Sequence, residues 1–430
     1  MTISDQAAAL AAKLDEPATY LSENQKYLSG TQPLAFLSPN ARRDTKLGRV
    51  AVNIPSVQVG SIAERLRVTA LIRDGKEDAD LWADFVDNDL DQQLPEAFRL
   101  AMGLRTSYAI VWDKTGRAKP KVTIEHPSMV TIDVDPGTRE TVAGFKRWSV
   151  DGQTRAVMYL PDRIVSLRAD GEAAVHGFKE VGSVDNPLGV VPVVQFSNGD
   201  RSEIDDLKPL VDGLNKIVAD MMVGSEYYAR PRRWATGVEM ETDEDGRPVN
   251  PFPEGDRMMI AEQHEARFGS LPAADLQSYE AAVKILNGQI MAVSALPAHY
   301  LGQLVGQTPG ADGLRAAEAA LTARAEAKQA RFGRTVEAIG RLCYAIRTES
   351  DPDEVQVKVR WADPATRSVA QEADAVVKLH QAGLLPADYA LARLGYDREQ
   401  IAEIRRARRA EQIDRAVAEA ASASQGGDPE

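Results

Sequence analysis

The sequence predicts an α+β protein, and three observations lead to this class. Short runs rich in β-branched and aromatic residues follow one another between residues 108 and 200, with turn-forming residues between them. Stretches with an apolar residue at every third or fourth position occupy much of the remaining chain. Because the strand-like runs are grouped and separated by regular turn signals, they indicate an antiparallel sheet that forms one module with the helices before it.

Composition limits the size and the environment of the protein. With 430 residues, a mass of 46.8 kDa and 43% hydrophobic residues, the chain is long enough for two to four modules with substantial cores. Its one cysteine, Cys343, lies at core spacing in a helical stretch and excludes a disulfide framework. We therefore expect a buried thiol and a reducing compartment. The N-terminus lacks the basic start and apolar run of a secretory signal.

The charge distribution argues against a general nucleic-acid-binding surface. A formal net charge of −13 and a pI near 5.1 disfavour a protein that holds nucleic acid over its whole surface, so any DNA contact must be local or weak. No charged residue occurs between Lys284 and Asp312. The glycines, prolines and glutamines of that stretch exclude a membrane span, and we expect no membrane partner.

The first half of the chain is predicted to combine helices with the sheet. Helices are expected at residues 5–30 and 76–105, with an extended segment at 48–68 that has alternating apolar positions and Pro55. The strand runs are YAIVWD, KVTIEH, MVTIDV, GFKRWSV and AVMYL, and NPLGVVPVVQF closes the module near residue 200.

Two helices separated by an insertion follow the sheet region. Ser202 begins a sequence typical of a capping box, and a single apolar stripe predicts a helix over 204–229. Residues 230–271 are rich in proline and glycine, with a hairpin expected around Asp243–Gly246. A second helix is expected at 274–294, and the long uncharged loop 296–311 after it is of a length that is usually functional or disordered.

The last third is predicted to be mainly helical. Asp312 is expected to cap a helix over 312–347, which would extend for about 50 Å and carries seven basic and four acidic residues. A strand is expected at 355–361. Further helices are expected at 366–382, 387–393 and 397–420, followed by a disordered tail at 421–430.

Motifs for metal or nucleotide chemistry are weak. The five histidines never pair at the spacing of metal ligands, which disfavours a zinc site. Gly302, Gly306 and Gly310 precede a helix, but no lysine follows them as a phosphate-binding loop requires. Two acidic groups, Asp87 to Asp91 and the pair Asp133 and Asp135, leave a metal-dependent nuclease or hydrolase open as an alternative. We expect no cofactor.

A basic cluster occurs at the start of the insertion. Arg230, Arg232 and Arg233 precede Trp234, a composition typical of a phosphate-binding patch with a stacking aromatic side chain. The alternative is that these arginines bind the end of the preceding helix and pair with nearby glutamates.

The order of these elements resembles the portal proteins of tailed bacteriophages, of the long-tailed siphophage type. Three segments carry the likeness, namely DLKPLVDGLNKIVADMMVGSEYYARPRRWATG, LNGQIMAVSALPAHYLGQ and TPGADGLRAAEAALTARAEAKQARFGRTVEAIGRL. Together with the β-rich region they span roughly residues 20 to 365. A helical adaptor that forms no channel is the second alternative.

The resemblance implies a ring-forming subunit without catalytic activity. Its parts would be an N-terminal arm and wing (1–200, with strand segment 354–364), stem helices (204–229 and 274–294), a clip (230–271), a tunnel loop (296–311), a tunnel helix (312–347) and a crown (366–420). The ring, usually of about twelve subunits, would occupy one capsid vertex of the virion after assembly in the host bacterial cytoplasm. The implied partners are double-stranded DNA that passes without sequence specificity, the terminase large subunit, a head-to-tail adaptor, and the major capsid and scaffolding proteins.

The resemblance also selects candidate site residues. The tunnel loop would present His299, Tyr300, Leu301, Gln303, Leu304, Val305 and Gln307 to DNA, with Gly302, Gly306 and Gly310 providing flexibility. Basic residues of the tunnel helix would be Arg315, Arg324, Lys328 and Arg331. Because uncharged groups release no counterions, such a loop would contact moving DNA without holding it.

Overall fold

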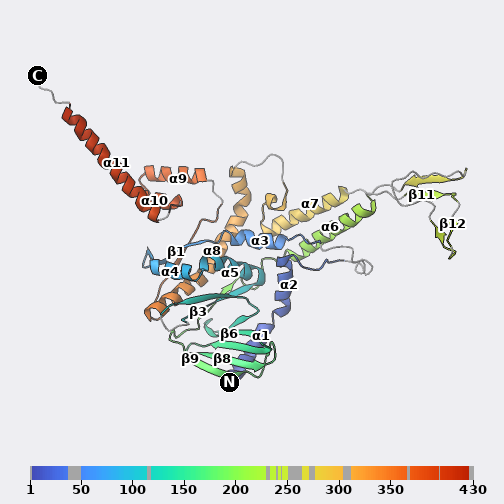
Figure 1. Cartoon of the computed structure of the whole chain (residues 1–430), viewed down its shortest axis with the longest axis horizontal. Helices are drawn as coiled ribbons and strands as arrows, with labels where there is room; N and C mark the ends of the chain where they lie inside the picture. The colour runs from blue at the N-terminus through green and yellow to red at the C-terminus, as the bar shows by residue number, and fades with distance from the viewer. Residues whose placement is uncertain are drawn as a thin grey trace. The chain divides into compact units, whose positions relative to one another are not determined.

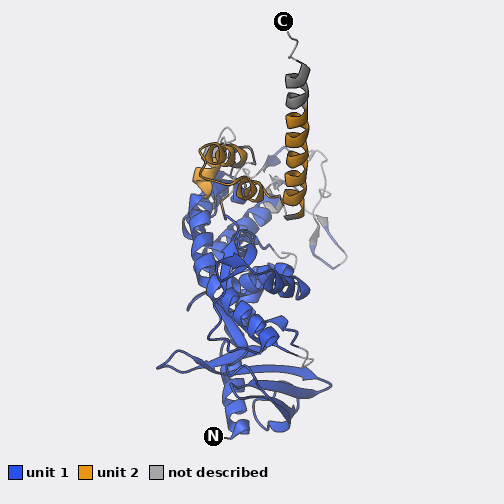
Figure 2. Cartoon of the chain, turned by 90° about the vertical axis from the view of Figure 1, so that its left-hand side faces the viewer, with its two compact units in different colours: residues 1–307, 319–364 blue, residues 308–318, 365–430 orange. Residues whose placement is uncertain are grey.

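The computed structural model describes most of the chain in two compact units. The described residues are 2–36, 50–113, 118–228, 233–238, 241–243, 245–249, 264–270, 277–303, 311–365, 369–396 and 398–425. The first unit comprises residues 1–307 and 319–364, and the second comprises 308–318 and 365–430 (Figure 2). None of the helices in these described ranges combines the length and hydrophobicity of a membrane-spanning segment.

The N-terminal helix expected at 5–30 is two helices, α1 (Ile3–Asp15) and α2 (Ala18–Ser29). Thr2 and Asp5 form a capping box at the start of α1. The break falls at Pro17, which precedes the first turn of α2 and has no amide hydrogen to continue the α1 ladder. Gly30 ends α2 in the left-handed conformation, with φ of 65°.

The prediction of an extended segment at 48–68 was wrong. Residues 54–63 form a helix, α3 (Ile54–Ala63), with Pro55 in its first turn, where a missing amide hydrogen costs little. The alternating apolar residues indicated a half-exposed strand, but most of α3 is buried, polar Gln58 and Ser61 included. A helix that is buried on nearly all sides has no single apolar stripe to identify it.

The helix expected at 76–105 is interrupted in the middle. It forms β2 (Lys76–Glu77), α4 (Ala79–Asp87) and α5 (Leu90–Leu104), with Asp89 between the helices at φ of 53°. Asn88 fixes the break, because its buried amide donates to the carbonyl of Pro120 at 3.1 Å and accepts from the amide of Val122 at 2.9 Å. The break therefore depends on a contact with a distant strand.

The strand runs form antiparallel sheets as predicted, but two rather than one. The first has the order β10-β3-β4 and the second the order β5-β6-β7-β8-β9 (Figure 1). A third small sheet has the order β15-β1-β2. The strands are β1 (Val68–Arg73), β3 (Thr106–Trp112), β4 (Lys121–Glu125), β5 (Val130–Val134), β6 (Thr141–Val150), β7 (Gln153–Tyr159), β8 (Arg163–Asp170), β9 (Lys179–Asp185), β10 (Val193–Ser197) and β15 (Lys358–Trp361).

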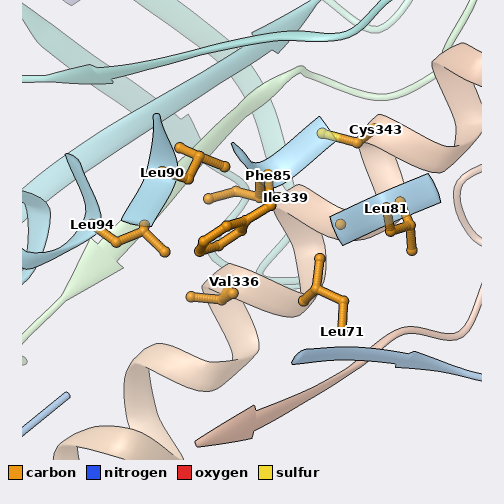
Figure 3. Close-up of a pocket in the computed structure, with 9 residues that line it drawn as sticks. Leu71, Leu81, Phe85, Leu90, Leu94, Val336, Ile339 and Cys343 are labelled. Atoms are coloured by element: carbon orange, nitrogen blue, oxygen red, sulfur yellow. The ribbon is translucent and has the colours of Figure 1, made fainter. Parts of the chain in front are cut away.

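The main core joins the long helix α8 (Ala311–Thr348) to α5 and the small sheets. The rings of Phe98 and Phe332 stack with centroids 5.4 Å apart, and Phe196 meets both edge-on. Cys343 is buried in this core, as the sequence predicted. An apolar pocket lies beside it (Figure 3), lined by Leu71, Leu81, Phe85, Leu90, Leu94, Val336, Ile339, Gly340 and Cys343.

Two helices pair beyond this core. In Figure 1, α6 (Lys208–Tyr228) and α7 (Gln277–Ser294) run side by side, and they close a smaller apolar cluster that includes Leu207, Val211 and Ile290. Helix α6 begins later than expected, because Ser202 caps a turn rather than the helix: its hydroxyl accepts from the amide of Ile204 and donates to the carbonyls of Met102 and Gly103.

The described residues of the insertion between α6 and α7 form four short strands. They are β11 (Arg233–Thr236), β12 (Glu241–Thr242), β13 (Pro248–Val249) and β14 (Arg267–Ser270), paired as β11-β14 and β12-β13. The hairpin turn expected around Asp243 is present. The Asp243 carboxylate accepts from the amides of Asp245 at 3.1 Å and Arg247 at 2.8 Å, which holds the turn.

The second unit is helical within its described residues. Helices α9 (Val369–Gln381), α10 (Ala387–Arg393) and α11 (Arg398–Gln425) agree with the helical runs expected there. The disordered tail expected from residue 421 was wrong in part, because α11 continues to Gln425. Asp312 was expected to cap α8, but the helix begins at Ala311, so Asp312 lies in its first turn.

Candidate functional site

The first part of the uncharged loop forms a defined turn. After α7, residues 298–301 form a short 3₁₀ helix, η2 (Ala298–Leu301), which ends at Gly302 with φ of 70°. The amide of Gln303 donates to the carbonyl of Ala298 at 3.0 Å. Only a residue without a Cβ adopts this left-handed conformation at low cost, so Gly302 fixes the turn here.

Side chains of η2 attach this turn to the protein. Tyr300 and Leu301 pack against the apolar cluster of α6 and α7. The Tyr300 hydroxyl accepts a hydrogen bond from the Arg65 guanidinium at 3.3 Å, and the His299 ring lies 4.9 Å from the Tyr300 ring. These three candidate residues therefore form an anchored base for the loop.

Arg65 links this base to the chain segment that follows β15. Its guanidinium also donates to the carbonyl of Pro364 at 3.1 Å. Gln329 of α8 donates to the carbonyls of Arg65 at 3.3 Å and Ala362 at 3.0 Å. One polar network thus joins α3, η2, α8 and the end of β15.

Two of the four basic candidates on α8 share one carboxylate within the chain. The Lys328 ammonium donates to the Glu203 carboxylate and to the Asn198 side-chain oxygen. The Arg324 guanidinium lies 3.5 Å from Glu203 and donates to the carbonyl of Val293 at 2.6 Å, at the end of α7. The side chains of Lys328 and Glu203 are only 13% and 14% exposed, so this ion pair is largely shielded from solvent.

The other two basic candidates, Arg315 and Arg331, are exposed. Within the described residues, no carboxylate lies within ion-pairing distance of Arg331. The sequence places these four cations on one helix without distinguishing them, but their surroundings in the structure differ. Two hold elements of the first unit together, and two remain at the surface.

The basic cluster of the insertion is described only in part. Arg230 and Arg232 lie outside the described residues, as do Leu304, Val305, Gly306, Gln307 and Gly310 of the loop. Arg233 begins β11, opposite Ser270.

Trp234 lies opposite Gly269 in the same strand pair, so close that a Cβ on Gly269 would meet its ring at 2.5 Å. Trp234 therefore covers the backbone of the paired strand and still leaves 44% of its surface exposed.

Three of the acidic residues considered for metal chemistry have structural partners. Asp87 pairs with Lys119 at 3.1 Å, and Asp133 pairs with Lys13 at 3.0 Å. Asp135 accepts hydrogen bonds from the amides of Gly137 and Thr138, and these bonds lower the pKa of its carboxyl. Across the described ranges, no group of three potential ligands could hold a metal ion.

Sequence reasoning missed the residues that organise this region. Arg65, Asn198, Glu203 and Gln329 come from distant parts of the chain. Each looks like an ordinary surface residue in its own segment. No local pattern marks such residues, because each has a partner more than 100 positions away.

Comparisons with known proteins identify relatives over almost the whole chain. Residues 8–414 match the family model "Phage portal protein, SPP1 Gp6-like". The portal protein of Mycobacterium phage L5 is 27% identical over 418 residues, covering 90% of this chain and 84% of the relative. The portal protein of Mycobacterium phage D29 is 28% identical over 392 residues, covering 83% and 78%.

Solved structures also align with this chain. A chain from the virion of a native gene transfer agent particle aligns with a TM-score of 0.44 at 14% identity, covering 88% of this chain and 99% of that one. A chain from the neck of the native particle, computed with C12 symmetry, aligns with a TM-score of 0.45 at 13% identity, covering 87% and 99%.

Proposed function

This chain belongs to the phage portal protein family, SPP1 Gp6-like, and we propose that it assembles into a ring-shaped DNA channel at one capsid vertex. The ring serves genome packaging with the terminase, genome retention and DNA ejection. The observation that carries this proposal is the match to the family model over residues 8–414. Because the match includes both helices of the α6–α7 pair and the whole of α8, every part of the proposed channel lies inside it.

Exposed apolar side chains on the α6–α7 pair support a lateral interface between copies. Met222 is 54% exposed and Ile285 is 66% exposed, although each lies in the middle of a long helix. Subunits of a closed ring meet through two different surfaces, so each needs apolar area that its own fold leaves uncovered. We assign α6 and α7 as the stem, and residues 230–271 between them as the clip.

The charge pattern near the loop supports passage of DNA without strong binding. Residues 285–311 contain no charged side chain, and Lys328 and Arg324 share the Glu203 carboxylate as an ionic partner. Each free cation that contacts a phosphate strengthens binding by releasing counterions. A passage with few free cations therefore allows DNA to slide. Residues 296–311 are assigned as the tunnel loop and α8 as the tunnel helix.

The remaining assignments follow the family resemblance. Residues 1–200 with strand segment 354–364 form the arm and wing, and 366–420 form the crown. The clip is the surface for the terminase large subunit during packaging and for the head-to-tail adaptor afterwards. Major capsid and scaffolding proteins surround the ring in the virion, which assembles in the host cytoplasm, and the chain itself performs no catalysis.

Electron microscopy of the purified full chain tests the proposal. We expect rings with a central hole and a sedimenting mass on the order of half a megadalton. A strictly monomeric protein at physiological salt would contradict the proposed ring. Deletion of residues 301–307 is expected to leave the ring intact and to impair DNA packaging or retention. A deletion that prevents assembly would assign the loop to a subunit interface instead.

A further inference from the structure

The outer face of the five-stranded sheet carries a row of cations. Strand pairing places Trp148 of β6 opposite Arg155 of β7, Arg155 opposite Arg168 of β8, and Arg168 opposite Lys179 of β9. Directly paired residues of antiparallel strands project from the same face. Arg155, Arg168 and Lys179 therefore form a line across three adjacent strands, which we call the basic row.

The basic row faces away from the core. The residues that flank Arg155 and Arg168 along their strands, such as Thr154, Ala156 and Leu167, are buried. The inner face packs against α1 through an apolar cluster that includes Ala156 and Leu167 (Figure 1). Arg155, Arg168 and Lys179 are all exposed.

Among the described residues, an apolar cluster covers one end of the outer face. Tyr159 and Ile164 pack against Tyr108 and Val193 of the neighbouring sheet. Val157 packs against the same cluster and lies two residues after Arg155, so the basic row begins about 7 Å along the strand from the covered end. The row therefore occupies the uncovered part of this face.

Acidic partners of these three cations are absent from the described part of the chain. Among the described residues, none of them has a carboxylate oxygen within ion-pairing distance, although Asp170 lies on the same face two positions after Arg168. Like charges directly opposite one another on paired strands destabilise a sheet. Three cations aligned on paired strands, in a chain with a net charge of −13, therefore indicate an anionic partner.

Acidic residues of a second copy are a weaker candidate for this anionic partner than DNA is. Among the exposed acids of α4 and α5, Asp87 already pairs with Lys119 and Glu96 with Arg99. Adjacent strands lie about 4.8 Å apart, so the basic row extends for about 10 Å. Double-stranded DNA carries about one charge per 1.7 Å of its axis, which is dense enough to meet all three cations.

Trp148 at the end of the row argues against single-stranded nucleic acid as the partner. Recognition of single strands depends on aromatic rings that are free to stack with bases. Trp148 is half-buried, and the Lys146 ammonium lies 5.8 Å from its ring centroid. Lys146 itself is bound to Glu125 at 2.6 Å, so it adds no free charge to the row.

We infer that the basic row of Arg155, Arg168 and Lys179 is a sequence-independent contact surface for the phosphate backbone of double-stranded DNA. This surface lies on the β-rich part of the chain and does not include the proposed tunnel residues. It gives an acidic protein a second, local place to contact the genome.

Binding of covalently closed circular plasmid to the assembled full-length protein tests this inference. A closed circle cannot thread through a preformed ring, so its binding reports surfaces outside the channel. The triple variant Arg155→Gln, Arg168→Gln, Lys179→Gln removes the row. The matched control Arg99→Gln, Lys119→Gln, Arg163→Gln removes the same charge from exposed cations that already pair with Glu96, Asp87 and Asp162.

We expect the row variant to bind the plasmid at least tenfold more weakly at low salt. The slope of log affinity against log salt should fall by about 2.7 relative to wild type, since each phosphate contact contributes roughly 0.9. The control should keep the wild-type slope. A variant with Arg155→Lys and Arg168→Lys keeps the charges and should bind like wild type.

Two outcomes would overturn the inference. One is a row variant with wild-type circular dichroism, wild-type sedimentation and an unchanged salt slope. The other is a folded row variant that sediments as a smaller species than wild type, which would assign the row to an interface between copies. A wild-type protein that forms no ring at all would count against the proposed channel and not against the row, because plasmid binding can still be measured on the unassembled chain.

Discussion

The two units of this chain bury their apolar side chains very differently. The first unit contains large side chains with almost no exposed surface, among them Phe98, Phe196 and Phe332. In the described part of the second unit, the buried hydrophobic residues are Val376 and Ala390. That unit instead exposes large apolar side chains: Val377, Leu384, Tyr389, Tyr396, Ile413 and Val417.

The difference indicates where each unit obtains its stability. A domain stabilised by its own core must remove enough apolar surface from water to offset the entropy of ordering the chain. The first unit does so with helices, sheets and stacked aromatic rings in one cluster. The described helices of the second unit bury few apolar side chains, so we expect contacts with neighbouring copies to supply the missing burial.

The largest expected effect is on the core of the first unit. Phe332→Ala removes a fully buried ring that contacts Phe98 and Phe196, and it should lower the free energy of unfolding by about 3–5 kcal/mol. Chemical denaturation of the full chain measures the change. Ile413→Ala in the second unit is the matched exposed substitution and should change it by less than about 0.5 kcal/mol. Equal losses would remove the contrast between the units.

The next effect concerns the shielded ion pair beneath α8. Glu203→Gln leaves Lys328 and Arg324 without their carboxylate and should cost about 3 kcal/mol in unfolding free energy. The control Asp133→Asn breaks the exposed pair with Lys13 and should cost less than about 1 kcal/mol. Similar values for both variants would show that Glu203 has no special part in holding α8.

A smaller effect is expected at the base of the loop. Tyr300→Phe keeps the ring in its apolar contacts and removes only the hydroxyl that accepts from Arg65. The loss of this hydrogen bond should cost about 1 kcal/mol. We also expect faster proteolysis of the loop, measured by limited digestion and mass spectrometry. Digestion at the wild-type rate would mean that the Arg65 contact does not hold η2.

The second unit should respond to substitution only after assembly. Ile413 and Val417 are each 63% exposed in the subunit, so replacing both with serine should change subunit unfolding by less than about 0.5 kcal/mol. We expect another copy to cover the same side chains in the assembled ring, so the ring of the variant should dissociate at a lower temperature. Light scattering during heating measures this. An unchanged dissociation temperature would contradict the proposed source of the second unit's stability.

The smallest expected effect is a pH dependence in the first unit. Burial lowers the pKa of the His126 imidazole below its ordinary value of 6.5, and Glu96 offsets this only in part. The unfolded chain therefore binds this proton more readily than the folded one, so stability is lost as pH falls below 6.5 through the folded pKa. His126→Asn should reduce the decrease in unfolding free energy between pH 7.5 and pH 5. An identical decrease would assign it to other groups.

Helices and strands were predictable from the sequence where one buried face or a regular series of turns set the residue pattern. The apolar stripe of α8 identified a long helix with Phe332, Val336 and Cys343 inward, and regular turns identified antiparallel strands. The pattern failed for α3, since a helix buried on most sides shows no stripe. It also failed at Asn88, where a helix breaks because the side chain binds a distant strand.

The sequence by itself determined the α+β class, the order of the elements, the uncharged stretch before α8 and the resemblance to portal proteins, because these are properties of composition and of neighbouring residues. Only the tertiary structure decided which charges are free. In the folded chain Arg324 and Lys328 pair with Glu203, and Arg65 donates a hydrogen bond to Tyr300. Strand register aligns Arg155, Arg168 and Lys179 across three strands. The physical reason is that an ion pair or a strand register depends on distances in space, and residues far apart in sequence carry no local sign of them.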